Sequence, residues 1–454
     1  MSQGRTDPHN LVHGSLIRAL AHMTVPIVVG DILQTGYNFI DTFFVSRIGI
    51  VEVGAVTFVM PIAFLIVSVA AGISTAGVSL ISQSTGAGFT RRSAEFATHL
   101  ILVGLGLSIV IGASGFVLLQ PLVAGFGLTG ALRVAVQEYL GFVFLATPFT
   151  FFTVIYAGIR QSQGRANKAL VVTGISLLLN VVFNYLFIFQ LSLGIRGAAL
   201  ATLCARAAAA VYGFVDLALR DRMLQIKPGS LRFQPTVAGL IVKLAVPAAV
   251  ARGATSLSFL VLNTIIVNFG TEVLAAFGIG SRINSLFFLP STGFGLALST
   301  IVGQSLGAGQ SDRARDAVQL TMIVSVGFAL IGAATLYTFS RSLAQIFSSD
   351  VLVLHHTVNY LNLVAVTVVP WAVFQTLAGV FQGAGFTRTA MTISLVRLWV
   401  LRIPLLVVIH RFTDVGAFSI WYSMLISNVL TAGVSIVLYY TIPWQRGLHD
   451  VLRS

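Results

Sequence analysis

Twelve long apolar stretches divide this sequence, and they constrain its fold more than any other feature. Each has at least about the length that an α-helix needs to cross a bilayer, which is ~20 residues. Only 9% of the 454 residues are charged, whereas about 25% are charged in a typical soluble domain. We therefore expect an all-α polytopic membrane protein. Its spans should lie at residues 18–46, 52–84, 94–121, 132–160, 168–190, 196–219, 238–268, 273–306, 314–339, 352–382, 390–410 and 415–440.

Basic residues are spread unevenly over the connections between these spans. The side that holds both ends of the sequence collects most of them, and the other side keeps only Arg47, Arg133, Arg196, Arg341 and Arg411. Because cytoplasmic loops carry the excess of positive charge, we expect both termini in the cytosol and the protein in the plasma (cytoplasmic or inner) membrane. The same bias accounts for the net charge of +13 without a nucleic-acid partner.

The two halves of the chain repeat one another. Pro26 recurs as Pro247, and the segment QSTGAG at 83–88 recurs as QSLGAG at 304–309 with the same separation along the sequence. We therefore expect two homologous six-helix lobes, residues 1–220 and 237–454, joined by a cytosolic linker at 221–236. Parallel repeats of this kind are typical of secondary transporters, which bind substrate and coupling ion near the middle of the bilayer.

A polar stripe runs along the first span. Asp31, Gln34, Asn38 and Asp41 fall within an arc of about 80° if the span is a regular helix. An ionised side chain at this depth costs roughly several kcal/mol, so such a stripe normally faces a water-filled cavity or a partner. A low-dielectric environment also favours the protonated form of a carboxyl group, which is the property that proton coupling needs.

The fifth span carries a second polar stripe, formed by Ser176, Asn180 and Asn184 at intervals of four residues. One interpretation is hydrogen bonding between packed helices. The other is a set of neutral oxygen ligands for a hard cation such as Na⁺, or of partners that hold Asp41.

Several short motifs occur in a fixed order. They are Pro26 followed by Tyr37-Asn38-Phe39-Ile40-Asp41, the two Gln-Ser-x-Gly-Ala-Gly segments, Gly158-x-x-Gln161-x-x-Gly164, and Asn180 followed by Gly194-x-x-Gly197-Ala198-Ala199-x-x-Thr202. Together they resemble the multidrug and toxic compound extrusion (MATE) family, most closely its DinF-like prokaryotic branch, over essentially the whole chain. The resemblance implies a V-shaped pair of lobes. It also implies an antiporter that exports amphipathic, mostly cationic or zwitterionic compounds in exchange for H⁺ or Na⁺, without a cofactor.

The resemblance also assigns roles to individual residues. Asp41 matches the coupling residue of the family, and its partners match Tyr139, Asn180, Thr202 and the carbonyl of Ala198. Asn184 stands where the family usually has an aspartate, which favours protons over sodium. If Na⁺ does bind, its ligands would be Asp41, Asn180, Asn184 and Thr202.

Other polar residues of the first lobe are assigned to a substrate cavity: Asp31, Gln34, Tyr37, Asn38, Ser176 and Arg206. For Asp31 two interpretations stay open, a carboxylate that attracts cationic substrates or a salt bridge with Arg206. The second lobe instead carries Arg252, Arg282, Arg397 and Arg402 within its spans. These arginines either have a structural role or contact an anionic group of a zwitterionic or acidic substrate.

Two other functions compete with the antiporter. A flippase for lipid-linked oligosaccharides, from the same superfamily, stays open because of the basic second lobe. An intramembrane aspartyl enzyme is not expected, because Asp31 and Asp41 would lie about 15 Å apart along the helix axis. No nucleotide-binding motif is present. The expected partners are small-molecule drugs and the lipid bilayer, and we expect a monomer.

Overall fold

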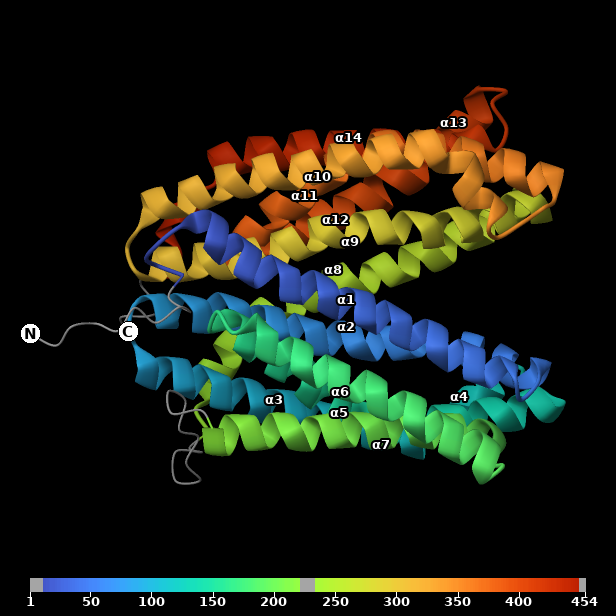
Figure 1. Ribbon diagram of the computed structural model, residues 1–454, viewed down its shortest axis with the longest axis horizontal. Coiled ribbons are helices and arrows are strands. Elements are labelled where there is room, and N and C mark those ends of the chain that lie inside the picture. The colour runs from blue at the N-terminus through green and yellow to red at the C-terminus, as the bar shows by residue number, and fades with distance from the viewer. Residues whose placement is uncertain (1–10, 221–232, 449–454) are drawn as a thin grey trace, which may run out of the picture. The chain divides into compact units, whose positions relative to one another are not determined.

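The computed structural model describes residues 11–220 and 233–448. Within this part of the chain twelve helical segments are long and apolar enough to cross a membrane, which confirms the expected fold class (Figure 1). The α-helices are α1 (Leu16–Ser46), α2 (Ile50–Gly86), α3 (Thr90–Val117), α4 (Leu119–Gly125), α5 (Gly130–Ser162), α6 (Ala166–Asn184), α7 (Gly194–Val215), α8 (Pro235–Ile266), α9 (Thr271–Gly307), α10 (Ser311–Gln345), α11 (Val351–Gly383), α12 (Thr387–Leu395), α13 (Ile403–Phe412) and α14 (Phe418–Thr441).

The observed spans follow the predicted ones with small shifts at their ends. The third span ends at Val117 rather than at 121, because the short helix α4 follows it. The ninth span is longer than predicted and covers Ser311–Gln345. Most of the predicted linker, residues 221–232, lies outside the described residues.

Three spans contain π-helical turns. These are η1 (Tyr185–Gln190) after α6, η2 (Asp216–Arg220) after α7, and η5 (Val396–Arg402) between α12 and α13. In the described ranges, two short 3₁₀ turns, η4 (Val267–Phe269) and η6 (Trp444–Arg446), follow α8 and α14. A π turn changes which residues share a helix face, and such turns occur frequently at functional sites.

The chain forms two compact units. One is Val29–Gly253, called here the N-unit, and the described residues outside that range form the C-unit. Helices α1 and α8 each contribute residues to both units. This division differs from the predicted lobes at 1–220 and 237–454, which therefore stay a prediction.

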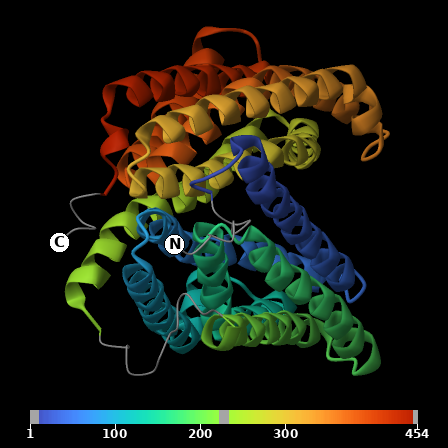
Figure 2. The same cartoon turned by 60° about the vertical axis from the view of Figure 1, so that its left-hand side comes forward.

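Within each unit, two long helices cross at a glycine. In the N-unit, α2 packs against α5, and a Cβ added at Gly158 would lie 2.1 Å from Ser74 Oγ. In the C-unit, α9 packs against α11, and a Cβ at Gly379 would lie 2.1 Å from the Gly295 carbonyl oxygen. Helices α10 and α14, orange and red in Figure 2, also pack against α11 in the C-unit. Small residues let membrane helices approach this closely.

The repeated Gly-Ala-Gly segments end helices in the same way. Gly88 and Gly309 both adopt the left-handed conformation, with φ of 76° and 74°. The next backbone N–H then donates back to the last turn, from Phe89 to Ser84 (2.9 Å) and from Gln310 to Ser305 (2.8 Å). This is the Schellman type of helix ending, which favours glycine because it has no Cβ. The motifs at 83–88 and 304–309 are therefore helix stops.

Candidate functional site

Five of the predicted coupling residues meet inside the N-unit. Asp41 comes from α1, Tyr139 from α5, Asn180 and Asn184 from α6, and Thr202 from α7. We call these five residues the Asp41 cluster. Asn180 and Asn184 lie one helical turn apart, so both amides reach the same side of α6.

Hydrogen bonds link the cluster into one chain. The Tyr139 hydroxyl donates to Asp41 Oδ2 (3.3 Å), and Asn184 Nδ2 donates to Asp41 Oδ1 (3.3 Å). Asn184 Nδ2 also donates to Asn180 Oδ1 (3.0 Å), and Asn180 Nδ2 donates to Thr202 Oγ1 (3.3 Å). Asp41 is only 7% exposed, and both asparagines are fully buried. A buried carboxyl group is therefore held by neutral donors.

One oxygen in this cluster has no hydrogen-bond donor. The amide nitrogen of Asn184 is used twice, and its carbonyl oxygen Oδ1 is buried without a partner among the described residues. Carboxylate, amide and hydroxyl oxygens of this kind are what a hard cation prefers. The oxygens of Asp41, Asn180, Asn184 and Thr202 thus fit a Na⁺ ion chemically. Ala198 is buried on α7, one turn before Thr202.

Arg206 lies next to this cluster. Its Cζ atom is 5.6 Å from the centre of the Tyr37 ring, and its charge is close enough to act on Asp41. The charge of Arg252, on α8, acts on Asp31. Both interpretations of Asp31, a carboxylate that attracts cationic substrates and a salt bridge with Arg206, stay predictions. Asp31 and Arg252 stand at equivalent positions of the internal repeat, so this position holds an acid in one half and a base in the other.

The other predicted cavity residues vary in exposure. Tyr37 is buried, Asn38 and Ser176 are half-buried, and Gln34 is exposed. All of them belong to the N-unit.

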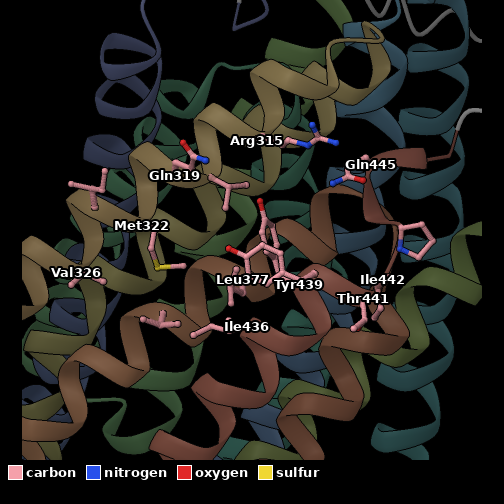
Figure 3. Close-up of a pocket in the computed structure, with 15 residues that line it drawn as sticks. Arg315, Gln319, Met322, Val326, Leu377, Ile436, Tyr439, Thr441, Ile442 and Gln445 are labelled. Atoms are coloured by element: carbon pink, nitrogen blue, oxygen red, sulfur yellow. The ribbon is translucent and has the colours of Figure 1, made fainter.

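A groove of about 930 Å³ occurs in the C-unit, where α10, α11 and α14 meet, and contains none of the predicted cavity residues (Figure 3). Its polar lining residues are Arg315, Gln319, Thr441 and Gln445, together with tyrosines of α14. Arg315 also forms an exposed ion pair with Asp312 (3.3 Å).

Sequence reasoning missed one buried set of charges. Asp216 in η2 is 3% exposed and forms ion pairs with Arg160 and with Lys168 (2.7 Å to Lys168). Tyr156 donates to the same carboxylate (2.8 Å), and Arg160 donates to Gln163 Oε1 (2.9 Å). This set ties together α5, α6 and the end of the sixth span. An acidic residue at the end of an otherwise apolar stretch was the signal that could have revealed it.

A helical protein with twelve candidate spans, an internal repeat and a buried acid in its first span has the features of a secondary transporter. The chain belongs to the MATE family: the MatE sequence model matches residues 26–186 and again residues 247–408. The two matches begin at the equivalent prolines Pro26 and Pro247, which confirms the internal repeat.

Curated relatives extend over nearly the full chain. A FAD transporter of Shewanella oneidensis is 25% identical over 440 residues, covering 96% of each chain. The probable multidrug resistance protein YpnP of Bacillus subtilis is 24% identical and covers 87% of this chain and 89% of its own. Members of this family are transporters and not enzymes. The assignment to the DinF-like branch stays a prediction.

Solved structures confirm the fold. A MOP-superfamily transporter from Pyrococcus furiosus superposes with a TM-score of 0.90 at 22% identity, covering all of both chains. A MATE protein in complex with MaL6 gives a TM-score of 0.91 at 22% identity, covering 99% of each chain.

Proposed function

We propose that this MATE transporter is a secondary active antiporter. It exports amphipathic, mostly cationic or zwitterionic compounds in exchange for H⁺ or Na⁺, and Asp41 is the coupling residue. The observation that carries the proposal is a buried carboxyl group held by neutral hydrogen-bond partners from other helices.

Such a carboxyl group can be ionised or protonated, and the same hydrogen-bond partners accommodate both forms. When ionised, it accepts hydrogen bonds from Tyr139 and Asn184. When protonated, it no longer carries the charge that Arg206 attracts. Because the partners lie on α5 and α6, a change of state alters the contacts of α1 with those helices. That difference is what couples ion binding to movement of the first span.

The identity of the ion depends on Asn184. An aspartate at this position would give the site two carboxylates, whereas Asn184 leaves one. A single carboxyl group favours proton exchange. The unpaired Asn184 Oδ1 supports Na⁺ as the second possibility, because it supplies a neutral ligand next to Asp41.

The orientation, the substrate cavity and the oligomeric state of the protein are also part of the proposed function. The positive charge on one side of the spans supports cytosolic termini in a cytoplasmic membrane. The substrate cavity would include Asp31, Gln34, Tyr37, Asn38, Ser176 and Arg206. One chain would carry both repeats and act as a monomer.

The test is efflux from proteoliposomes driven separately by a pH gradient and by a Na⁺ gradient. We expect the wild-type protein to respond to the pH gradient, and Asn184→Asp to gain a response to Na⁺. Norfloxacin and ethidium serve as substrates, with empty liposomes as the control. If neither gradient moves either compound, the antiport proposal is wrong and the lipid-linked oligosaccharide flippase becomes the better candidate.

The relationship to a FAD transporter supports a second substrate class. FAD carries two phosphate groups, and the C-unit places several arginines within its spans. Uptake of radiolabelled FAD into everted vesicles would test this class directly. No uptake above that of control vesicles would remove it.

A further inference from the structure

Two arginines lie buried side by side in the C-unit. Arg397 is 5% exposed and Arg402 is 3% exposed, and both belong to the π-helical turn η5. In an α-helix, residues five apart point about 140° away from each other. In a π-helix the hydrogen bonds join residues five apart, so their side chains lie nearly above one another. The π turn therefore brings both guanidinium groups to one face.

The two guanidinium groups converge on one neutral acceptor. Arg402 Nη2 donates to Asn428 Oδ1 (2.8 Å), and Arg397 Nη1 approaches the same oxygen at 3.5 Å. Arg402 Nε also donates to Ser427 Oγ (3.1 Å). Arg397 Nε is buried without a hydrogen-bond partner among the described residues. Each guanidinium has five N–H donors, so these acceptors satisfy only a part of them.

Acidic residues of the C-unit lie away from this pair. Those that the structure describes after Gly253 occur in the first two turns of a helix or in a connection, and they are Glu272, Asp312, Asp316, Asp350 and Asp414. The two arginines repel each other electrostatically, and the charge of Arg402 also acts on Tyr360. A buried charge costs free energy unless an opposite charge or enough hydrogen bonds compensate for it.

Aromatic side chains form the wall beside the arginines. The Arg397 guanidinium lies 4.8 Å from the centre of the Trp371 ring and 5.1 Å from that of Phe374. Trp371 is stacked on Phe288, with ring centres 4.9 Å apart. Its indole Nε1–H is buried and has no hydrogen-bond partner among the described residues. Unpaired donors, two positive charges and flat apolar faces suit a carboxylate or phosphate that is attached to an aromatic body.

We propose that Arg397 and Arg402 form a binding site for an anionic group, either on a transported amphiphile or as a free inorganic anion. This inference deepens the proposed transport function, on which its substrate arm rests. The anionic group binds between the two guanidinium groups. It accepts hydrogen bonds from the guanidinium N–H groups that do not donate to Asn428 or Ser427. Among the transported compounds, the site favours those that carry an anionic group.

The first experiment compares two aromatic substrates that differ in one respect. Norfloxacin carries a carboxylate, and ethidium is a cation without one. We expect Arg402→Gln and Arg397→Gln to reduce norfloxacin efflux by about tenfold, which is the effect of losing a charge-assisted hydrogen bond. Ethidium efflux should stay within about twofold of the wild type, because it makes no such bond. Arg402→Lys, which keeps the charge, should retain most norfloxacin efflux.

Arg341→Gln is the matched control, because Arg341 is an exposed arginine within a span of the same unit. It should leave the ratio of norfloxacin to ethidium efflux unchanged. If the Arg402 and Arg397 variants lower the efflux of both compounds equally, their role is structural and the proposal is wrong. Size-exclusion profiles and thermal unfolding of each variant separate a folding defect from a change in selectivity.

The second experiment needs no transport, so it separates failure of this site from failure of the antiport proposal. All four tryptophans of the chain lie in the C-unit, and Trp371 is in contact with Arg397. Purified protein is titrated with sodium chloride, sodium benzoate or sodium phosphate at constant ionic strength while tryptophan fluorescence is measured. A saturable change that Trp371→Phe and Arg397→Gln abolish supports the site.

The anion that produces the change identifies the source of the ligand. A response to chloride or phosphate indicates a free inorganic anion, and a response to benzoate alone indicates a group on the substrate. If none of the three salts changes the fluorescence while efflux of both drugs is intact, the proposal is wrong.

Discussion

Each repeat places a buried charged side chain near an equivalent tyrosine, and the sign of the charge differs between the two repeats. Tyr139 and Tyr360 stand at matching positions of the repeat, and both are buried. In the N-unit, Tyr139 contacts the carboxylate of Asp41. In the C-unit, the charge of Arg402 acts on Tyr360. The two halves thus repeat the same sequence of helices, but one half carries a buried acid beside its tyrosine and the other carries buried arginines.

The largest effect is expected at Asp41. Asp41→Asn removes the only carboxyl group of the Asp41 cluster but keeps its shape, so gradient-driven efflux should fall to the level of empty liposomes. Efflux of ethidium from proteoliposomes under a pH gradient measures this. Asp312→Asn is the control, because Asp312 is an exposed acid. Normal efflux by Asp41→Asn would show that the buried acid of the first repeat is not needed for coupling.

The next largest effect concerns a third set of buried charges, in which the acid Asp216 is paired with two bases. Asp216→Asn should lower the free energy of unfolding by about 3 kcal/mol, because it leaves Arg160 buried without its counter-charge. Thermal unfolding in detergent measures this change. Glu138→Gln, which breaks the exposed pair with Arg196, should cost much less, because solvent screens exposed ion pairs. Equal losses in the two variants would show that burial does not decide the strength of these pairs.

A matched pair of substitutions tests whether the two equivalent tyrosines differ in function. Tyr139→Phe removes a hydrogen bond to Asp41 and should reduce proton-driven efflux about fivefold, corresponding to roughly 1 kcal/mol. Tyr360→Phe removes the same hydroxyl group from the C-unit, and the pH dependence of efflux should not change. Initial rates between pH 6 and 8 (about two units around neutrality) distinguish the two variants. A similar change in the pH profile of both variants would place coupling in both repeats.

The smallest effect is expected where the repeats are structurally alike. Gly88→Ala and Gly309→Ala both place a Cβ on a residue in the left-handed conformation with open space around it. Each should lower the free energy of unfolding by about 1 kcal/mol, and by the same amount. Thermal unfolding of the two variants side by side tests this equality. A clear difference would mean that the helix endings, like the charges, have diverged.

Sequence reasoning was most successful where a feature is local or repeated. The spans follow from hydropathy, and the repeat follows from motifs at a constant separation. The Asp41 cluster was assembled by resemblance to a family, and its two asparagines share a helix face because they are four residues apart. Hydrophobic pattern and α-helical spacing were sufficient for these features.

The other features of the site depend on information that hydropathy and α-helical spacing do not contain. Arg397 and Arg402 share a face only because η5 is a π-helix, and α-helical spacing predicts that they diverge. The charge of Arg252 acts on Asp31 although the two residues are distant in sequence, and no pattern along a single helix predicts this. Asp216 lies at the end of a span, where its burial depends on Arg160 and Lys168 from other helices.

In the proposed antiport, the single carboxyl group of the Asp41 cluster limits the stoichiometry of transport. One titrating group can return one proton per cycle, so export of a monovalent cation in exchange for H⁺ moves no net charge. Such an exchange can reach an accumulation ratio of about tenfold for each unit of pH difference. A zwitterion carries no net charge, so its export with one inward proton is electrogenic, and a membrane potential of 100 mV adds roughly 2.3 kcal/mol. An energised membrane would therefore drive zwitterionic compounds out to much steeper gradients than simple cations.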